Sequence, residues 1–114
     1  MSPEPHLGAL EALVLLAVMR LGRDAYGASI RKELKKRARR APTVSTIYVT
    51  LLRMEEKGLV RSHQGESTSP RGGRPKRLFE LTAGGVRALR SEREVMERMW
   101  EGLDAELGGE RGGS

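Results

Sequence analysis

A glycine- and proline-rich segment with four cations, residues 70–77, constrains the fold of this chain more than any other feature. It separates two short segments of roughly alternating apolar and polar residues, 59–63 and 77–81. Such an arrangement predicts a two-stranded hairpin with a long loop. Because the two glycines permit close approach and the cations can donate charge-assisted hydrogen bonds, the loop suits a phosphate backbone. A solvated hairpin tip is the simpler alternative.

The segment before the hairpin, residues 43–57, predicts a helix with two distinct faces. Apolar side chains recur on one face: Ile47, Leu51 and Met54, with Leu52 beside them. Small, polar and basic side chains fall on the other face: Thr46, Val49, Thr50, Arg53 and Lys57. Thr43 or Ser45 can cap the start, and Gly58 stands where a left-handed residue ends a helix, with Leu59 as its apolar partner. The helix is therefore bounded at both ends.

Two more helices are expected ahead of it. Apolar residues at helical spacing run from Leu7 until Gly22 stops the first helix, and Asp24 can cap the second. The inward positions of the second helix lie four apart: Tyr26, Ile30 and Leu34. Seven cations crowd its far end against one acid: Arg31, Lys32, Lys35, Lys36, Arg37, Arg39 and Arg40. The helix dipole favours some of them, and the excess predicts contacts with phosphates.

Thr82 can cap a last helix that extends to Leu107. Its apolar side chains follow alternating three- and four-residue steps: Val86, Leu89, Met96, Trp100, Leu103 and Leu107. Only Arg93 interrupts this seam, either by pairing with Glu92 or Glu97 across a dimer or by snorkelling into solvent. An isolated helix with such a stripe needs a partner, and 38% hydrophobic residues is low for a globule of 114 residues. We therefore expect an oligomer.

Charge divides along the chain. Residues 1–90 hold 18 basic and 8 acidic side chains, whereas residues 91–114 hold 3 and 7, so a net charge of +10 is followed by −4. The absence of cysteine excludes disulfides and fits a reducing cytoplasm. The apolar stretch 13–19 is short and has no basic leader, so neither a secretory signal nor a membrane span is expected. We expect a cytoplasmic protein.

The order of three helices, a hairpin and a final helix predicts a winged helix-turn-helix, a mainly α fold of the α+β class. We expect residues 1–82 to form a DNA-binding domain, 83–107 a dimerisation helix and 108–114 a disordered tail. In such a fold the third helix enters the major groove of double-stranded DNA, and the hairpin loop reaches the flanking phosphates.

The outer face of the third helix matches the chemistry of nucleic acid. Thr46 and Thr50 can bond base edges or phosphates, and Val49 can touch a thymine methyl group. Arg53 can pair with a guanine edge or a phosphate. These side chains are small enough, apart from the arginine, to allow close approach.

Motifs along the chain resemble those of the PadR family of transcriptional regulators. They are Leu7-Gly8 with Leu10-Glu11-x-Leu13-Val14-Leu15-Leu16, Asp24-Ala25-Tyr26-Gly27, Ile47-Tyr48-Val49-Thr50-Leu51-x-Arg53-Met54-Glu55-Glu56-Lys57-Gly58-Leu59-Val60, and Arg71-Gly72-Gly73-Arg74-x-Lys76-Arg77 with Leu81-Thr82. The resemblance covers about residues 7–103. It implies a homodimeric winged-helix repressor of the branch with a short C-terminal region, and such a dimer would bind an inverted-repeat operator.

The resemblance also implies roles for single residues. DNA contacts are expected from the third helix and the hairpin loop: Thr43, Ser45, Thr46, Tyr48, Val49, Thr50, Arg53, Arg71, Gly72, Gly73, Arg74, Lys76 and Arg77. Tyr48 corresponds to a family tyrosine at a phosphate, whereas Ser45 stands where the family usually has glycine. Dimer contacts are expected from apolar side chains: Leu10, Val14, Val86, Leu89, Met96, Trp100 and Leu103. Family members commonly lose DNA affinity when a small aromatic compound binds, and Trp100 is either a residue of that effector site or a packing residue.

Other classes of function fit less well. A winged helix can bind another protein instead of DNA, and this is the alternative function. A membrane-surface helix needs bulky apolar anchors, which the cluster at residues 31–40 lacks. His6 and His63 are isolated, no spacing suggests a catalytic or metal site, and Gly72-Gly73 lacks the continuation of a phosphate-binding loop. We therefore expect neither an enzyme nor a cofactor.

Overall fold

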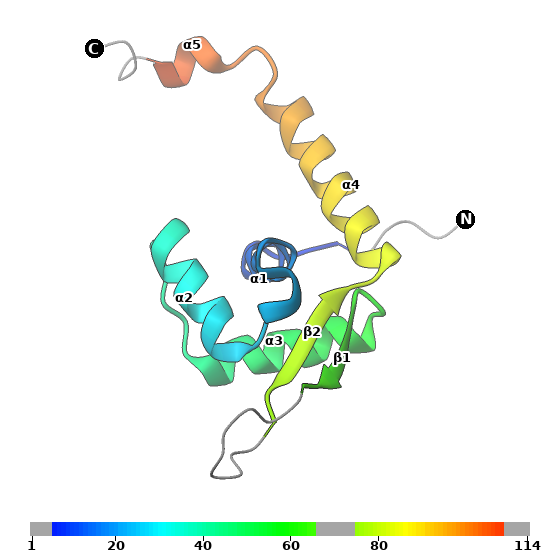
Figure 1. The fold of residues 1–114 in the computed structure, drawn as a ribbon. Coiled ribbons are helices and arrows are strands. Elements are labelled where there is room, and N and C mark those ends of the chain that lie inside the picture. The colour runs from blue at the N-terminus through cyan, green and yellow to red at the C-terminus, as the bar shows by residue number, and fades with distance from the viewer. Residues whose placement is uncertain (1–5, 66–74, 109–114) are drawn as a thin grey trace.

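Three helices and a two-stranded sheet form one body, from which a fourth helix projects (Figure 1). The computed structural model describes residues 6–65 and 75–108. In chain order the elements are α1 (Ala9–Leu21), a 3₁₀ turn (Gly22–Asp24), α2 (Gly27–Arg37), α3 (Val44–Glu56), β1 (Val60–Gln64), β2 (Arg77–Leu81), α4 (Ala83–Trp100) and α5 (Asp104–Leu107). This order confirms the predicted mainly α fold with a hairpin.

The core lies where α1, α2 and α3 meet the sheet. Its largest fully buried side chains come from all of these elements: Val14, Leu15, Val18, Ile30, Ile47, Leu51, Met54, Val60 and Phe79. On α3, the three residues whose spacing predicted an apolar face are completely buried. Because full burial of such a side chain contributes roughly 1.5–3 kcal/mol relative to exposure, this cluster holds the three helices together.

The start of α3 is fixed by a side-chain cap. The Oγ1 atom of Thr43 accepts a hydrogen bond from the backbone N–H of Thr46 at 3.1 Å, so that Thr43, and not Ser45, is the N-cap. The Thr43 hydroxyl also donates to Oγ1 of Thr46 at 3.0 Å. The cap therefore occupies the hydroxyl groups of both threonines at the entry to α3.

The end of α3 is fixed by backbone hydrogen bonds around a left-handed glycine. Gly58 has a φ of +78°. The N–H of Gly58 donates to the carbonyl of Glu55, and the N–H of Leu59 donates to the carbonyl of Met54, both at 2.9 Å. These two bonds form a Schellman motif, in which Leu59 folds back toward Met54. The predicted helix terminator is thereby confirmed.

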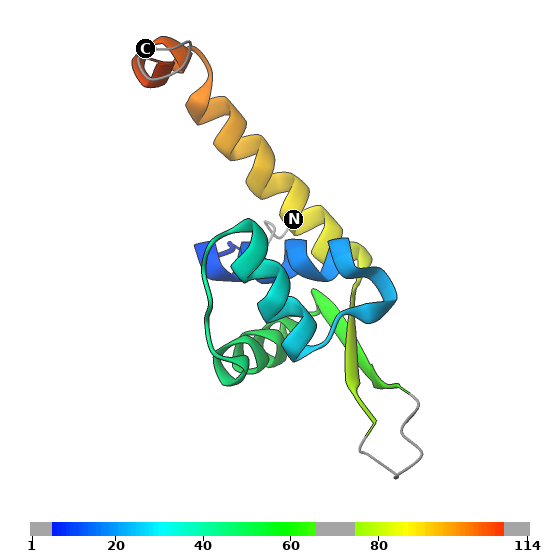
Figure 2. The ribbon, with the colours of Figure 1, turned by 60° about the vertical axis from the view of Figure 1, so that its left-hand side comes forward.

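The hairpin pairs β1 with β2 in antiparallel register, from Val60 opposite Leu81 to Gln64 opposite Arg77. It matches the predicted hairpin, except that β1 begins and ends one residue later. A further hydrogen bond, 2.9 Å from the Phe79 N–H to the Ala25 carbonyl, ties β2 to the link between α1 and α2. The base of the hairpin is thus attached to the helical body, beyond which the hairpin extends (Figure 2).

The start of α2 differs from the prediction that Asp24 caps it. Asp24 belongs to the 3₁₀ turn, and α2 begins at Gly27 with Tyr26 as its N-cap residue. The Ser29 side chain accepts a hydrogen bond from the Tyr26 N–H at 2.9 Å, and its hydroxyl approaches the Asp24 carbonyl at 2.5 Å. A serine within the first turn therefore caps α2, because the 3₁₀ turn leaves Asp24 too early in the chain to do so.

α4 is anchored to the body at its first turn. The Oγ1 atom of Thr82 accepts a hydrogen bond from the Gly85 N–H at 3.0 Å, which confirms Thr82 as the cap, and the hydroxyl donates to the Gly58 carbonyl at 2.6 Å. A Cβ atom at Gly85 would collide with the carbonyl oxygen of Leu59. Glycine therefore allows α4 to pack directly on the turn that ends α3.

The far end of α4 leaves the body. The predicted helix to Leu107 is wrong in its last part, because α4 ends at Trp100, Gly102 adopts a φ of +82°, and α5 follows. Every residue of the segment 93–107, here called the distal segment, is exposed. Figure 2 shows this segment extending away from the other elements. Neither α4 nor another helix in the described parts of the chain is long and apolar enough to cross a membrane.

Candidate nucleic-acid interface

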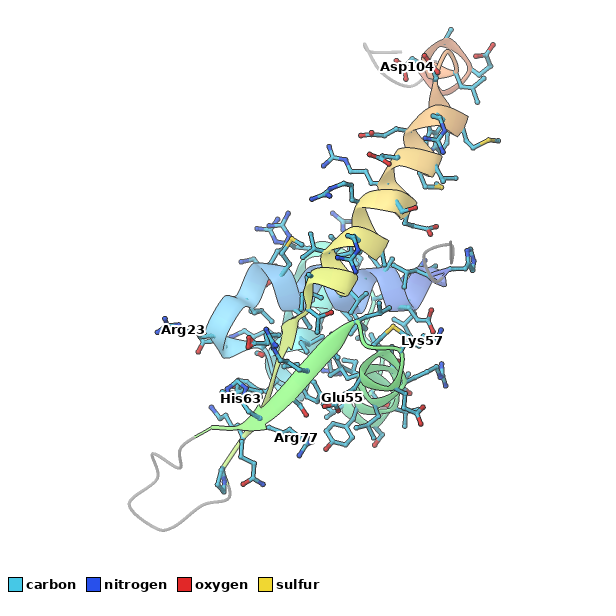
Figure 3. The ribbon with its side chains drawn as sticks, turned by 90° about the vertical axis from the view of Figure 1, so that its right-hand side faces the viewer. Arg23, Glu55, Lys57, His63, Arg77 and Asp104 are labelled. Carbon is cyan, nitrogen blue, oxygen red and sulfur yellow. The ribbon has the colours of Figure 1, made fainter. Side chains whose placement is uncertain are left out.

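α3 and the hairpin lie on the same side of the molecule, opposite to α4 (Figures 1 and 2). The outward side chains of α3 are exposed: Ser45, Thr46, Tyr48, Val49, Leu52 and Arg53. Figure 3 shows Lys57 at the end of α3 and Arg77 on the hairpin, with Asp104 at the opposite end of the molecule. Because α3 and the hairpin face the same way, a single extended partner can contact both.

Tyr48 links the exposed face of α3 to the hairpin. Its ring meets the ring of Phe79 edge to face, with centroids 6.1 Å apart and planes at 81°. Phe79 is buried, whereas 37% of Tyr48 is exposed. Because edge-to-face rings attract each other, the contact orients Tyr48 and leaves part of it open to a partner.

The base of the hairpin loop is attached to α2. The Gly65 N–H donates to the Lys76 carbonyl at 2.7 Å, and the Lys76 ammonium lies 4.3 Å from the centre of the Tyr26 ring. At an exposed site such a cation–π contact contributes about 0.5–1 kcal/mol. Arg77, the next cation, is exposed. Four predicted contact residues of the loop lie outside the described residues: Arg71, Gly72, Gly73 and Arg74.

Thr50 does not lie on the exposed face of α3, so the prediction that it faces DNA is wrong. Only 4% of the residue is exposed, and its hydroxyl donates to the Thr46 carbonyl at 2.9 Å. Threonine can occupy a buried helical position because its hydroxyl bonds back to the preceding turn. Thr50 follows Ile47 by three residues and precedes Met54 by four, and both of these are buried. This helical spacing places Thr50 on the buried face of α3 and could have predicted its burial.

Glu11 of α1 draws two cations of α3 toward the body. Its Oε1 atom accepts a hydrogen bond from the Gly8 N–H at 2.8 Å, and its Oε2 atom lies 3.8 Å from both Arg53 Nη1 and Lys57 Nζ. The Arg53 side chain is 54% exposed, so these ion pairs add little to stability. Sequence reasoning missed Glu11 because the contact joins distant parts of the chain.

The predicted dimer contacts fall into three groups. Three residues are exposed on the distal segment: Met96, Trp100 and Leu103. Two residues are half-buried at the body: Leu10 and Val86. Val14 is 0% exposed, so the prediction that it faces a second copy is wrong, whereas Leu89 is 8% exposed and lines a surface groove between α1 and α4. An apolar stripe on a helix indicates that its side chains are buried. For Val14 the residues that bury it belong to the same protomer.

Arg93, which interrupts the apolar seam, has a partner within its own helix. Its Nε atom lies 2.9 Å from Oε2 of Glu97, four residues later on α4. The two side chains are 80% and 61% exposed. Arg93 is therefore held along the surface of α4 by a pair that ordinary helical spacing provides.

The basic end of α2 is set apart from α3. Arg31 donates from Nε to the Pro42 carbonyl at 2.9 Å, and Arg37 pairs with Glu33 at 2.6 Å. In both ribbon views α2 ends at the level of α1 and the base of α4, whereas α3 and the hairpin lie on the other side (Figures 1 and 2). This placement gives no support to the expectation that the whole cluster contacts the same phosphates as the hairpin.

Together these elements define a winged helix-turn-helix protein, in which α2 and α3 form the helix-turn-helix and β1 and β2 form the wing. The sequence model of the Transcriptional regulator PadR-like family matches residues 15–91. That range contains α2, α3 and both strands, with parts of α1 and α4. The chain belongs to the PadR-like family of transcriptional regulators, which confirms the resemblance in its motifs.

Solved structures from this family share the fold. A PadR family transcription regulator from Clostridium difficile has 28% sequence identity and a TM-score of 0.71, over 89% of this chain and 100% of that chain. A PadR family regulator from Eggerthella lenta has 27% identity and a TM-score of 0.66, over 86% of this chain and 85% of that chain. Bacillus subtilis PadR, solved in complex with operator DNA, has 19% identity and a TM-score of 0.65, over 75% of this chain and 48% of that chain. Among curated proteins, none matches this chain significantly.

Proposed function

We propose that this protein is a homodimeric transcriptional repressor that binds an inverted-repeat operator and is released by a small aromatic or drug-like effector. The observation that carries the proposal is the common orientation of α3 and the wing, opposite to α4 (Figure 2). A helix fits the major groove, and a hairpin beside it reaches the flanking phosphates. The operator complex of Bacillus subtilis PadR, which has the same fold, supports DNA as the partner.

The exposed side chains of α3 suit direct contacts with base edges and phosphates. Thr46 and Val49 are short and exposed, so the helix backbone can approach the groove floor. Arg53 reaches a guanine edge or a phosphate if it leaves Glu11, and Tyr48 beside the wing contacts a phosphate. Thr43 acts mainly by fixing the start of α3, where free backbone N–H groups favour a phosphate.

A second copy provides the partner that the distal segment needs. Met96, Trp100 and Leu103 are between 42% and 47% exposed, which is a large apolar surface for one helix end. When two copies pair through these residues, two α3 helices can enter successive major grooves about 34 Å apart. An inverted repeat follows from that two-fold symmetry.

Footprinting on the DNA around the gene of this protein tests the proposal. We expect two protected half-sites, centred about one helical turn or ~10 base pairs apart and related by inverted symmetry. No shift of any duplex at low salt would instead favour a winged helix that binds another protein. A single protected half-site would contradict the dimer.

The salt dependence of binding tests the wing. Lys76→Ala and Arg77→Ala should each reduce the log–log slope of affinity against salt by about 0.9, since each removes one phosphate contact. The matched control is Arg93→Ala, which removes the same charge from α4 and should leave the slope unchanged. Equal slopes for all three variants and the wild type would remove the wing from the DNA interface.

The effector is tested through Trp100, the only tryptophan in the chain. Its side chain is 46% exposed, so stacking of an aromatic compound on it would change its fluorescence. We expect compounds that shift the emission to weaken operator binding in the same concentration range. A broad panel of aromatic compounds with neither effect would leave Trp100 as a packing residue of the dimer.

A further inference from the structure

A shallow apolar groove lies between α1 and α2, with two arginines and one glutamate among its lining residues. Its volume is about 340 Å³, and its main lining residues are Leu13, Leu16, Ala17, Leu34, Ala38 and Arg20. Arg37 and Glu33 also line it and pair with each other at 2.6 Å, and Leu16 is 43% exposed. The α2 end beside the groove has seven cations against one acid between residues 31 and 40. The groove therefore suits an acidic segment with apolar side chains.

The distal segment has the complementary character. It contains five acidic and two basic side chains. Leu103 and Leu107 stand four residues apart at α5, so both fall on one side, and they are 42% and 47% exposed. Glu101, Asp104 and Glu106 accompany them and are exposed. A helix as short as α5 is not stable in water by its own hydrogen bonds, and a surface that covers the two leucines would stabilise it.

A continuous apolar path connects the groove to the surface beside α4. Leu16 lines the groove between α1 and α2 and also a second groove between α1 and α4. The second groove is lined further by Met19 and Val86. A helix of a second copy that crosses α1 at Leu16 can therefore place its apolar side chains in the second groove. The residues that follow this helix can then enter the first groove, between α1 and α2.

We propose that α5 of a second copy of this chain docks in the groove between α1 and α2. Leu103 and Leu107 enter the groove, and the carboxylates of α5 face Arg20 and share Arg37 with Glu33. The inference rests on the homodimer of the proposed function and specifies where α5 of each chain binds in that dimer. The chain's own α5 is held away from its groove, because α4 runs as an unbroken helix of 18 residues that carries α5 outward (Figure 1).

Charge reversal at the groove provides the first test, with the dimer dissociation constant measured by sedimentation equilibrium. Arg20→Glu combined with Arg37→Glu should raise this constant about tenfold or more, because like charges then face each other. The matched control is Lys32→Glu combined with Lys36→Glu, which makes the same charge change on α2 at a different hollow, lined by Leu21 and Tyr26. The control should change the constant less than about threefold.

Mixing of variants provides the second readout. Asp104→Arg combined with Glu106→Arg should weaken the homodimer in the same way, and mixing this variant with Arg20→Glu/Arg37→Glu should restore a heterodimer. The chain has no cysteine, so Ala38→Cys and Leu107→Cys, introduced in separate chains, should form a covalent heterodimer on mild oxidation. A disulfide within one chain that carries both substitutions, formed at a dilution where the protein is monomeric, would overturn docking between copies.

The outcomes separate this inference from the proposed function. A wild-type dimer that binds its operator, with equal dissociation constants for the groove and control variants and no disulfide between chains, would overturn the docking of α5 alone. A wild-type monomer would overturn the docking together with the homodimer. Loss of operator affinity by the groove variant with an unchanged dimer would place the cations on DNA, and the docking would again be wrong.

Discussion

Apolar side chains form a buried core in the body made of α1, α2, α3 and the sheet, whereas they are exposed in the distal segment. In the body, Leu51 and Phe79 are at most 1% exposed, whereas Met99 and Trp100 of the distal segment are 69% and 46% exposed. Charge follows the same division, since the part up to residue 90 is basic and the part after it is acidic. The body therefore buries its apolar core within one chain, whereas the apolar side chains of the distal segment remain open to a partner.

The largest expected effect tests this division directly. Phe79→Ala should destabilise the protein by about 3–5 kcal/mol, because it leaves a cavity under the wing. Met99→Ala, the matched distal variant, should change monomer stability by less than about 0.5 kcal/mol. Urea unfolding at a concentration where the protein is monomeric measures both. A cost for Met99→Ala similar to that for Phe79→Ala would mean that the distal segment has partners within its own chain.

The junction between the two regions should show the next effect. Gly85→Ala should destabilise by about 1–3 kcal/mol, because the added methyl group meets the Leu59 carbonyl. Gly84→Ala has only ordinary contacts, the nearest at 3.4 Å to the Gly58 carbonyl, and should stabilise α4 by about 0.5–1 kcal/mol. Thermal unfolding of the two neighbouring variants compares them. Equal effects would show that α4 is not packed as closely on the end of α3 as we describe.

A smaller effect is expected at the start of α3, within the body. Thr43→Ala should cost about 1 kcal/mol, since the N–H of Thr46 loses its acceptor. Thr43→Ser keeps the hydroxyl and should remain within a few tenths of a kcal/mol of the wild type. Unfolding by denaturant, followed by circular dichroism, measures both variants. A loss for serine as large as that for alanine would assign the role of Thr43 to its methyl group.

The smallest effect concerns the contact between α1 and α3. Glu11→Gln keeps an oxygen for the Gly8 N–H and removes the charge near Arg53 and Lys57, so stability at low salt should fall by about 1 kcal/mol or less. Glu80→Gln, which removes a more exposed carboxylate near Arg61, is the control and should have no larger effect. At high salt the stability difference between Glu11→Gln and the wild type should be smaller. A loss of stability that does not depend on salt would point to lost packing instead.

Much of the fold could be predicted from local patterns. Residues 47, 51 and 54 share a face in any α-helix, a glycine after a helix favours the left-handed conformation, and a threonine before one favours capping. The structure confirms these predictions at α3, at Gly58 and at Thr82. The wing followed from the spacing of two short alternating segments around a loop rich in glycine and proline.

The candidate site was less accessible to such reasoning. Polarity suggested that Thr50 faces outward, but its hydroxyl is satisfied inside the helix, so the residue can be buried. Val14 and Leu89 lie on apolar stripes, and a stripe does not reveal whether its own core or a second copy covers it. The contact of Glu11 with Arg53 joins α1 to α3 and has no local signature.

The sequence by itself determined the elements, their order and their caps, because these depend on side chains within a few residues of one another. It also determined the division into a basic and an acidic part. The tertiary structure alone decided that α3 and the wing face one way while the basic end of α2 and the distal segment face elsewhere. Orientation of this kind arises from packing between elements distant in the chain, so no local pattern encodes it.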